Sequence, residues 1–375
     1  MVRRWHGTLK GIFTAFHGHL IKALAHCSCA MVISGHCHSG RVAAMMAGKA
    51  KVASHRRRLE RLIARQSPTA EQLMNTLAAS ILSGWQGRPI ILILDETSRS
   101  LRPRQGIDPP QGNSLCCMKV SVGYRKRALP LAFECYRTRE HHRSGENESL
   151  PDKVGALLEN LATIIPEGSS VTLLADRGLC WPVLIDFCRQ HHWHYVFRLQ
   201  GQTALRYTDA SEQLHSTYVN QLLKHPGEQW FGQDVEVFKT AGWKKANVIA
   251  VWENRCKEPW LLVSDQPAIY ARCRGYAKRV WCEQMHRDEK SAGFNWRKSH
   301  VDDPVHASRL LVLMALAMLL AISTGSYVIK AGLRHCLEAR KNRQLSIFQI
   351  GLRYLRNCLQ NPDNTSDCRI HLYPP

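Results

Sequence analysis

One short stretch of the chain places four chemically active side chains at helical spacing. It is the uninterrupted run YAKRVWCEQMHRDEK, which contains Tyr276, Arg279, Glu283 and Lys290. If the run is an α-helix, these four positions fall on one narrow stripe. A phenol, two cations and a carboxylate on one stripe suit a site that holds a metal ion and binds phosphate groups. Because most mixed-charge helix faces are simply solvated, the stripe needs support from elsewhere in the chain.

That support comes from two aspartates that each follow a short apolar run. Ile90 to Leu94 ends at Asp95, and Val171 to Ala175 ends at Asp176. Such runs predict strands covered on both faces, and α/β sheets place ligand sites at the carboxyl ends of their strands. With Glu283, the two aspartates give three carboxylates, which suit two Mg²⁺ ions, with Mn²⁺ as a substitute. The alternative is that each aspartate only caps the turn that follows it.

The charge balance indicates a polyanionic partner. The chain has 375 residues and carries 51 Lys plus Arg against 30 Asp plus Glu, a net charge of +21. The basic residues are spread along the whole sequence, which favours nucleic acid; a membrane surface or a ribosome is the alternative. No signal peptide is evident, so we expect a cytoplasmic protein whose 14 cysteines are reduced and mostly buried.

The order of the remaining patterns predicts a mixed α/β fold. A hairpin is expected at residues 115–136, a helix at 147–165, a further helix at 181–191 and a strand at 194–199. Alternating runs at 234–239, 246–253 and 259–265 predict a β-rich insertion. The expected regions are a helical DNA-binding domain at 1–70, a linker helix at 71–89, a catalytic core at 90–200 and 269–330, the β-rich insertion at 201–268, and a helical C-terminal region at 331–375.

The first 70 residues read as basic helices. An apolar face predicts one helix over residues 6–25, and a second helix is expected over 54–65. The second carries Arg56, Arg57, Arg58 and Arg61, and it is either the DNA-reading helix of a helix–turn–helix or a solvated helix that touches phosphate. Nearby, Cys27, Cys29 and Cys37 with a histidine could form a zinc site, although their spacing fits buried thiols better.

The longest apolar run, LLVLMALAMLLAIS at 310–323, is the one segment that raises the question of a membrane. It is shorter than the roughly 20 residues that a membrane-spanning helix needs. We therefore expect a buried core helix over 304–323 and no membrane partner, followed by an amphipathic helix over 345–359.

The motifs together resemble the insertion sequence four family of DDE transposases. Tyr276, Arg279, Glu283 and Lys290 fit the family signature Y-x2-R-x3-E-x6-K without a gap. ILILDETS and TLLADRG match the segments that carry the first two acidic residues, Asp95 and Asp176. The resemblance extends from about residue 85 to 360. It implies a ribonuclease H-like catalytic core with a β-rich insertion between the second aspartate and the glutamate.

The resemblance also implies an activity and partners. Asp95, Asp176 and Glu283 would hold the metal ions, and Tyr276, Arg279 and Lys290 would contact phosphates. The partners would be double-stranded DNA, both terminal inverted repeats and target, and a second copy of the chain in a nucleoid-associated, bacterial-type complex. Some family members stack a flipped base on a tryptophan of the insertion. Trp260 is the best match, Trp252 and Trp243 are rivals, and core packing is the alternative.

The predicted activity is DNA strand cleavage followed by strand transfer. Two other functions fit the same residues. One is a catalytically decayed or domesticated transposase that only binds DNA, against which the intact acidic residues speak. The other is a plain metal-dependent DNA nuclease, which the phosphate-binding stripe does not distinguish from a transposase.

Overall fold

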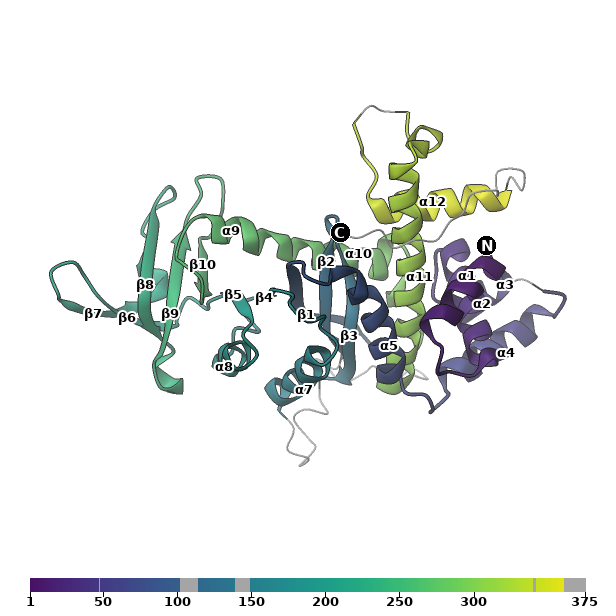
Figure 1. Cartoon of the computed structure of the whole chain (residues 1–375), viewed down its shortest axis with the longest axis horizontal. Helices are drawn as coiled ribbons and strands as arrows, with labels where there is room; N and C mark the ends of the chain where they lie inside the picture. Colours follow the sequence, from purple (N-terminus) through teal and green to yellow (C-terminus); the bar gives the residue numbers. More distant parts are fainter. Residues whose placement is uncertain (47, 102–113, 139–148, 340–341, 361–375) are drawn as a thin grey trace.

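The computed structural model describes residues 1–46, 48–101, 114–138, 149–339 and 342–360. The molecule is elongated, with a β-rich end, a central sheet flanked by helices, and a helical end that holds the N-terminus (Figure 1). A long helical segment runs along the molecule from the β-rich end to the centre. The expected C-terminal tail from residue 361 and the predicted start of a helix at 147–148 lie outside the described residues.

A single mixed sheet of ten strands connects the centre to the β-rich end. Its strand order is β3-β2-β1-β4-β5-β10-β9-β8-β6-β7. The first five strands form the ribonuclease H-like arrangement that the sequence predicts: an antiparallel meander, then two strands parallel to β1. Their bounds are β1 Ile90–Ser100, β2 Ser114–Tyr124, β3 Arg127–Arg137, β4 Val171–Ala175 and β5 His194–Arg198. Helices α7 (Leu150–Ala162) and α8 (Pro182–Gln190) make the connections on either side of β4.

The predicted insertion extends this sheet beyond β5 through β10, which is antiparallel to β5. Five strands occupy the region where the sequence predicted three. The two that sequence analysis missed, β6 (Ala204–Thr208) and β7 (Leu214–Tyr218), form a hairpin whose residues are mostly exposed or half-buried. Because little of this hairpin is buried, its apolar alternation is weak. The other three are β8 Gln229–Val237, β9 Lys244–Val251 and β10 Trp260–Ser264.

Among the described residues, five helices form the first part of the chain. The single helix expected over 6–25 is wrong: α1 (Val2–Ile12) ends at the buried Phe13, and α2 (Gly18–Ser34) begins after His17. The break lets α1 fold back on α2, where the Trp5 indole donates a hydrogen bond to the buried Ser28 hydroxyl at 2.8 Å. The remaining helices are α3 Ser39–Ala44, α4 Val52–Ile63 and α5 Ala70–Leu82.

The core helix predicted over 304–323 is the first part of the long helix α11, Pro304–Lys330. By length and composition it could cross a membrane, but 83% of its most apolar window is buried inside the protein. Helix α12 (Ile347–Gln360) crosses α11 (Figure 1) at a point where two glycines meet. A Cβ at Gly325 would lie 1.9 Å from the Ile347 carbonyl oxygen, and one at Gly351 would lie 1.7 Å from the Ala321 carbonyl oxygen. The crossing therefore requires glycine at both positions.

Candidate active site

The stripe residues lie on a helical segment, 271–292, that changes its winding three times. It runs through α9 (Ala271–Tyr276), a 3₁₀ turn (Ala277–Arg279), α10 (Val280–Arg287) and a π-helical turn (Asp288–Ala292). The prediction of one regular α-helix is therefore wrong in detail. The looser π turn changes the direction of the residues after Arg287, and it buries Asp288 and Glu289 beneath the segment.

Asp95 and Asp176 lie on neighbouring parallel strands in the same register. Leu94 of β1 pairs with Ala175 of β4, and each aspartate is the next residue. Asp95 is 7% exposed, with its side chain on the buried face of β1. The Oδ1 atom of Asp176 accepts hydrogen bonds from the backbone amides of Gly178 (2.9 Å) and Leu179 (3.2 Å). These bonds fix the carboxylate where the strand ends, so the turn-capping role and a ligand role are compatible in this residue.

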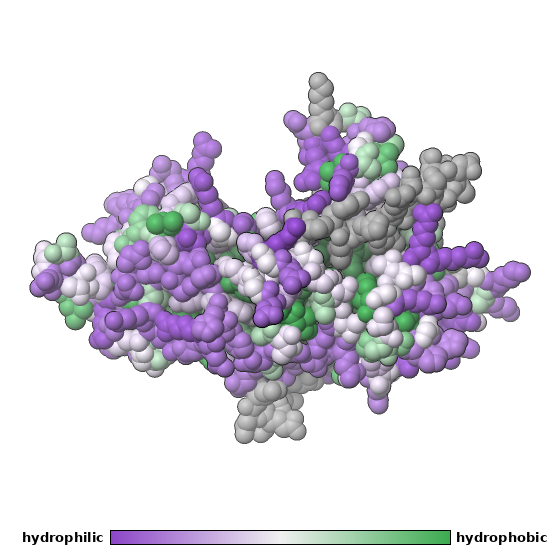
Figure 2. All heavy atoms as spheres, in the orientation of Figure 1, coloured by the Kyte–Doolittle hydropathy of each residue, from purple (hydrophilic) through white to green (hydrophobic). Residues whose placement is uncertain are grey.

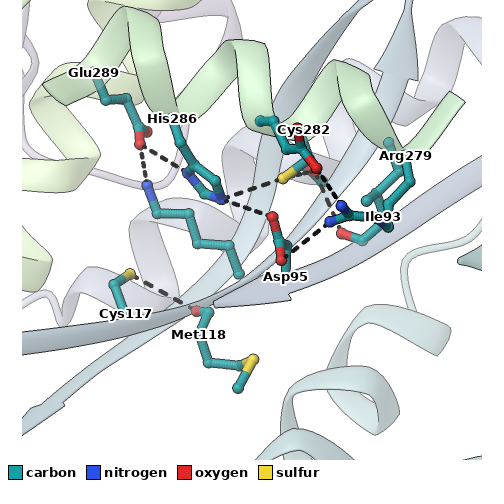
Figure 3. Close-up of polar contacts among 11 residues, drawn as sticks. Ile93, Asp95, Cys117, Met118, Arg279, Cys282, His286 and Glu289 are labelled. Atoms are coloured by element: carbon teal, nitrogen blue, oxygen red, sulfur yellow. Dashed lines mark hydrogen bonds and ion pairs between the residues drawn. The ribbon is translucent and has the colours of Figure 1, made fainter. Parts of the chain in front are cut away.

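Arg279 joins the third carboxylate to the first. Its guanidinium Nη1 lies 3.5 Å from Asp95 Oδ1, and its Nη2 donates to Glu283 Oε1 (Figure 3). The Arg279 side chain is 18% exposed and that of Glu283 is 49% exposed. Burial lowers the pKa of Arg279, but Tyr276, Asp95, Glu283 and Asp176 raise it above its usual value. Arg279 thus pairs with two of the three predicted acidic residues, Asp95 and Glu283.

The chemistry of these donors suits a divalent metal ion, although the described residues whose ligand atoms lie within 4.8 Å of one another are Asp95, Cys282 and His286. The oxygen donors come from two strand ends and a facing helix, and carboxylate oxygens are the ligands that Mg²⁺ prefers. The guanidinium of Arg279 supplies positive charge between Asp95 and Glu283, which shows that these two carboxylates stabilise a cation there.

Comparison with known families identifies the chain. Residues 86–320 match the family model described as the transposase DDE domain, which is more than half of the sequence. The chain belongs to the DDE transposase family. No curated protein matches it closely enough to count as a relative. The matched range starts just before β1 and ends within α11, so it includes both aspartates, the insertion and the helical segment 271–292.

Two aromatic residues of this transposase pack together beside the carboxylates. The Tyr276 ring meets the Trp260 ring edge to face, with centroids 5.6 Å apart. Tyr276 is 4% exposed, whereas Trp260 is half-buried at the start of β10. Burial raises the pKa of Tyr276 to about 12, although Arg279 opposes this rise. The structure thus brings Trp260 to the edge of the site, while Tyr276 lies beneath Arg279.

Lys290 lies in the π turn, close enough to the site for its charge to interact with Asp95 and Glu289. It is half-buried. Burial, followed by the nearby cations Arg297 and Lys119, lowers the pKa of Lys290. The π turn interrupts the regular helix on which the predicted stripe depends, so the contact of Lys290 with a phosphate stays a prediction.

Behind Asp95, a chain of buried polar groups runs into the core (Figure 3). His286 Nε2 lies 3.4 Å from Asp95 Oδ2, and His286 Nδ1 lies 3.5 Å from Glu289 Oε2. Lys119 of β2 is fully buried and pairs with the same Glu289 oxygen at 2.5 Å. Sequence analysis missed these residues. Two signals in the sequence could have indicated them. Lys119 is a lone lysine in the apolar run LCCMKVSV, and His286 and Glu289 are three positions apart on the predicted helix.

Burial and these contacts shift the pKa values of Glu289, His286 and Asp288. Burial would raise the pKa of Glu289, but Lys119 and His286 hold it at about 2. Burial would lower the pKa of His286, but Cys282, Asp95 and Glu289 raise it well above its usual range. The adjoining Asp288 has its pKa raised to about 7 by burial, against the effect of Arg127, whose Nε lies 3.2 Å away.

The other predicted residues have contacts of their own. Arg56 pairs with Glu60 at 2.7 Å on α4, and Arg57, Arg58 and Arg61 of the same helix are exposed. Trp243 lies under Arg206, 4.5 Å from its guanidinium, and the Trp252 indole donates to the Cys256 carbonyl at 3.0 Å. Burial raises the pKa of each of Cys27, Cys29 and Cys37 to about 12, and among the described residues these thiols are not part of a group of three ligand atoms close enough to share a metal ion.

Proposed function

We propose that this transposase binds the terminal inverted repeats of an insertion sequence, cleaves a DNA strand at each repeat and joins the freed end to target DNA. The observation that supports this most directly is that Arg279 pairs with both Asp95 and Glu283, while Asp176 ends the strand next to that of Asp95. A protein that only held DNA would not need three carboxylates, which repel phosphate unless metal ions or other cations intervene.

In this proposal Asp95, Asp176 and Glu283 hold two Mg²⁺ ions, or Mn²⁺ in their place. Bound there, the ions would supply Lewis acidity for attack on the phosphodiester. Arg279 exchanges its carboxylate partners for a phosphate, which a guanidinium can bind through two parallel hydrogen bonds. Tyr276 is too buried to meet DNA directly, so its contribution is to position Arg279 from below.

The remaining assignments concern DNA contacts outside the cleavage site and the contact between two protomers. The exposed arginines of α4 would contact the repeat outside the cleavage site, within a helical end-binding region at 1–70. Figure 2 shows a mostly hydrophilic surface over α4 and over the insertion. Two protomers would bridge two transposon ends, with 331–375 as a candidate for their contact, in the cytoplasm and on the nucleoid.

The test is a cleavage assay on the element's own inverted repeat. The protein is incubated with a labelled duplex that carries the repeat, with Mg²⁺ or with EDTA, beside a duplex with the repeat scrambled. We expect nicks at the outer boundary of the repeat with Mg²⁺ and none with EDTA. Adding an unlabelled target duplex then separates a transposase, which forms joined products, from a nuclease. Tight binding without a cut in either condition would contradict the proposal and indicate a decayed enzyme.

A further inference from the structure

A second set of side chains with the chemistry of metal ligands shares Asp95 with the three carboxylates. Asp95, Cys282 and His286 are all buried, and their ligand atoms lie within 4.8 Å of one another. His286 Nε2 is 3.4 Å from Asp95 Oδ2 and 3.4 Å from Cys282 Sγ. A tetrahedral zinc ion with bonds of about 2.0–2.3 Å separates its ligand atoms by about 3.3–3.6 Å. These two distances therefore already match those around a zinc ion.

The groups behind these three side chains are those that support metal ligands. Metal-bound histidines usually donate their other ring N–H to a carboxylate, and Glu289 Oε2 lies 3.5 Å from His286 Nδ1. Lys119 holds Glu289 in place through the buried pair at 2.5 Å. The Ser121 hydroxyl donates to Cys282 Sγ at 3.6 Å. His286 and Cys282 thus each have their orientation fixed by a neighbour.

Asp95 presents one oxygen to each of the two sites. Oδ1 faces Arg279, on the side of Glu283, whereas Oδ2 faces His286 and Cys282 (Figure 3). We propose that Asp95, Cys282 and His286 bind a thiophilic divalent ion such as Zn²⁺, and that the bound ion inhibits the enzyme by drawing Asp95 away from Mg²⁺. The inhibitory half of this inference depends on the proposed function; the binding half does not.

The donor set explains the choice of ion. One sulfur, one imidazole nitrogen and one carboxylate oxygen suit Zn²⁺ and Co²⁺, whereas Mg²⁺ prefers oxygen alone. Water would complete the tetrahedron, as in other zinc sites with three protein ligands. The Cys282 thiol loses its proton to solvent on binding, as does the imidazole when His286 is charged. The carboxylates of Asp95 and Glu289 and the thiolate then balance the ion and the Lys119 ammonium.

Cobalt provides a direct test of binding that needs no DNA. The full-length protein is titrated with Co²⁺ alone, and the thiolate-to-cobalt charge-transfer absorption is recorded. We expect about one equivalent of the absorbing complex, displaced by Zn²⁺ and absent from Cys282→Ser. Cys336→Ser is the matched control: Cys336 Sγ lies 3.4 Å from His335 Nε2 but is exposed and outside the cluster. It should keep the band.

A second variant distinguishes loss of a metal ligand from misfolding. His286→Gln should weaken Co²⁺ binding by at least about tenfold, with circular dichroism confirming that the protein is folded. A folded wild-type protein with no charge-transfer band, or an equal band in Cys282→Ser, would overturn the inference.

Inhibition is measured as the Zn²⁺ concentration that halves each variant's own cleavage rate at fixed Mg²⁺. Cys336→Ser should match the wild type, and Cys282→Ser should need at least about tenfold more Zn²⁺. Equal sensitivity in all three would overturn the inhibitory half and leave the binding half standing. A cobalt band in a protein that cuts no DNA would contradict the proposed function instead.

Discussion

Two glutamates on the helical segment 271–292 have the same kind of partner but opposite surroundings. Glu283 pairs with Arg279 and its side chain is 49% exposed; Glu289 pairs with Lys119 and its side chain is 3% exposed. At Glu283, water and a substrate can reach the carboxylate, so its cation can be exchanged for a metal ion. At Glu289 the pair is sealed in the core, where an exchange would leave a charge unpaired. In the proposed function, the same residue type thus serves the reaction in one place and the fold in the other.

The sharpest way to break this comparison is to neutralise the exposed glutamate. Glu283→Gln should lower the cleavage rate by at least about 10³-fold, equivalent to about 4 kcal/mol of barrier, because a metal ligand is lost. The free energy of unfolding should change by no more than about 0.5 kcal/mol, as for other exposed positions. Single-turnover cleavage and urea denaturation measure the two quantities.

The matched control is Glu159→Gln on α7, which removes an exposed carboxylate paired with His191 at 3.1 Å. It should cleave at the wild-type rate. Cleavage by Glu283→Gln within tenfold of the wild type would remove Glu283 from the metal site.

Neutralising the buried glutamate should have the reverse effect. Glu289→Gln leaves the Lys119 ammonium buried without its ion-pair partner, and breaking a buried pair in this way costs about 3–5 kcal/mol. The urea midpoint should therefore fall strongly, and any loss of cleavage should follow the loss of folded protein. A loss of stability under 1 kcal/mol would show that solvent reaches Lys119, and the contrast between the two glutamates would fail.

Lowering the pH should reduce the stability that the buried pair of Lys119 and Glu289 contributes to the fold. Lys119 and His286 hold the pKa of Glu289 at about 2, below its usual 4.5. A lowered pKa in the folded protein contributes stability that is complete above 4.5 and disappears as the pH falls toward 2. The difference in unfolding free energy between wild type and Glu289→Gln should therefore shrink across that range. A difference that stays constant from pH 6 to about 3 would contradict the lowered pKa.

The sequence predicted Glu283 as a site residue but did not predict the pair of Lys119 with Glu289. Asp95, Asp176 and Glu283 could be proposed from sequence because two carboxylates follow apolar strands and the third lies at a recognisable spacing on a helix. The partnership of Lys119 with Glu289 joins residues 170 positions apart, and its geometry depends on the π turn after Arg287. No local pattern encodes that turn, since the segment reads as a regular helix. The missed hairpin β6–β7 has the same cause: its position depends on β8, while its own residues are too exposed to alternate.

A smaller effect is expected at the edge of the site. If Trp260 stacks on an unpaired base, Trp260→Ala should weaken binding of a repeat end with a flipped or unpaired base by about 1–3 kcal/mol, and binding of the intact duplex less. Trp243→Ala is the control, because Trp243 lies under Arg206 in the insertion, away from the carboxylates. Equal losses on both substrates would assign Trp260 to packing against Tyr276 alone.

The smallest expected effect concerns Lys290, which lies between the two glutamates in burial. If its ammonium contacts a phosphate, Lys290→Ala removes one released counterion, and the slope of log binding constant against log salt should flatten by about one unit. Because the ammonium is half-buried among Arg297 and Lys119, removing it also relieves repulsion, so unfolding should not become easier. Filter binding across a salt series measures the slope. An unchanged slope with a raised urea midpoint would place Lys290 with the buried charges rather than on the DNA.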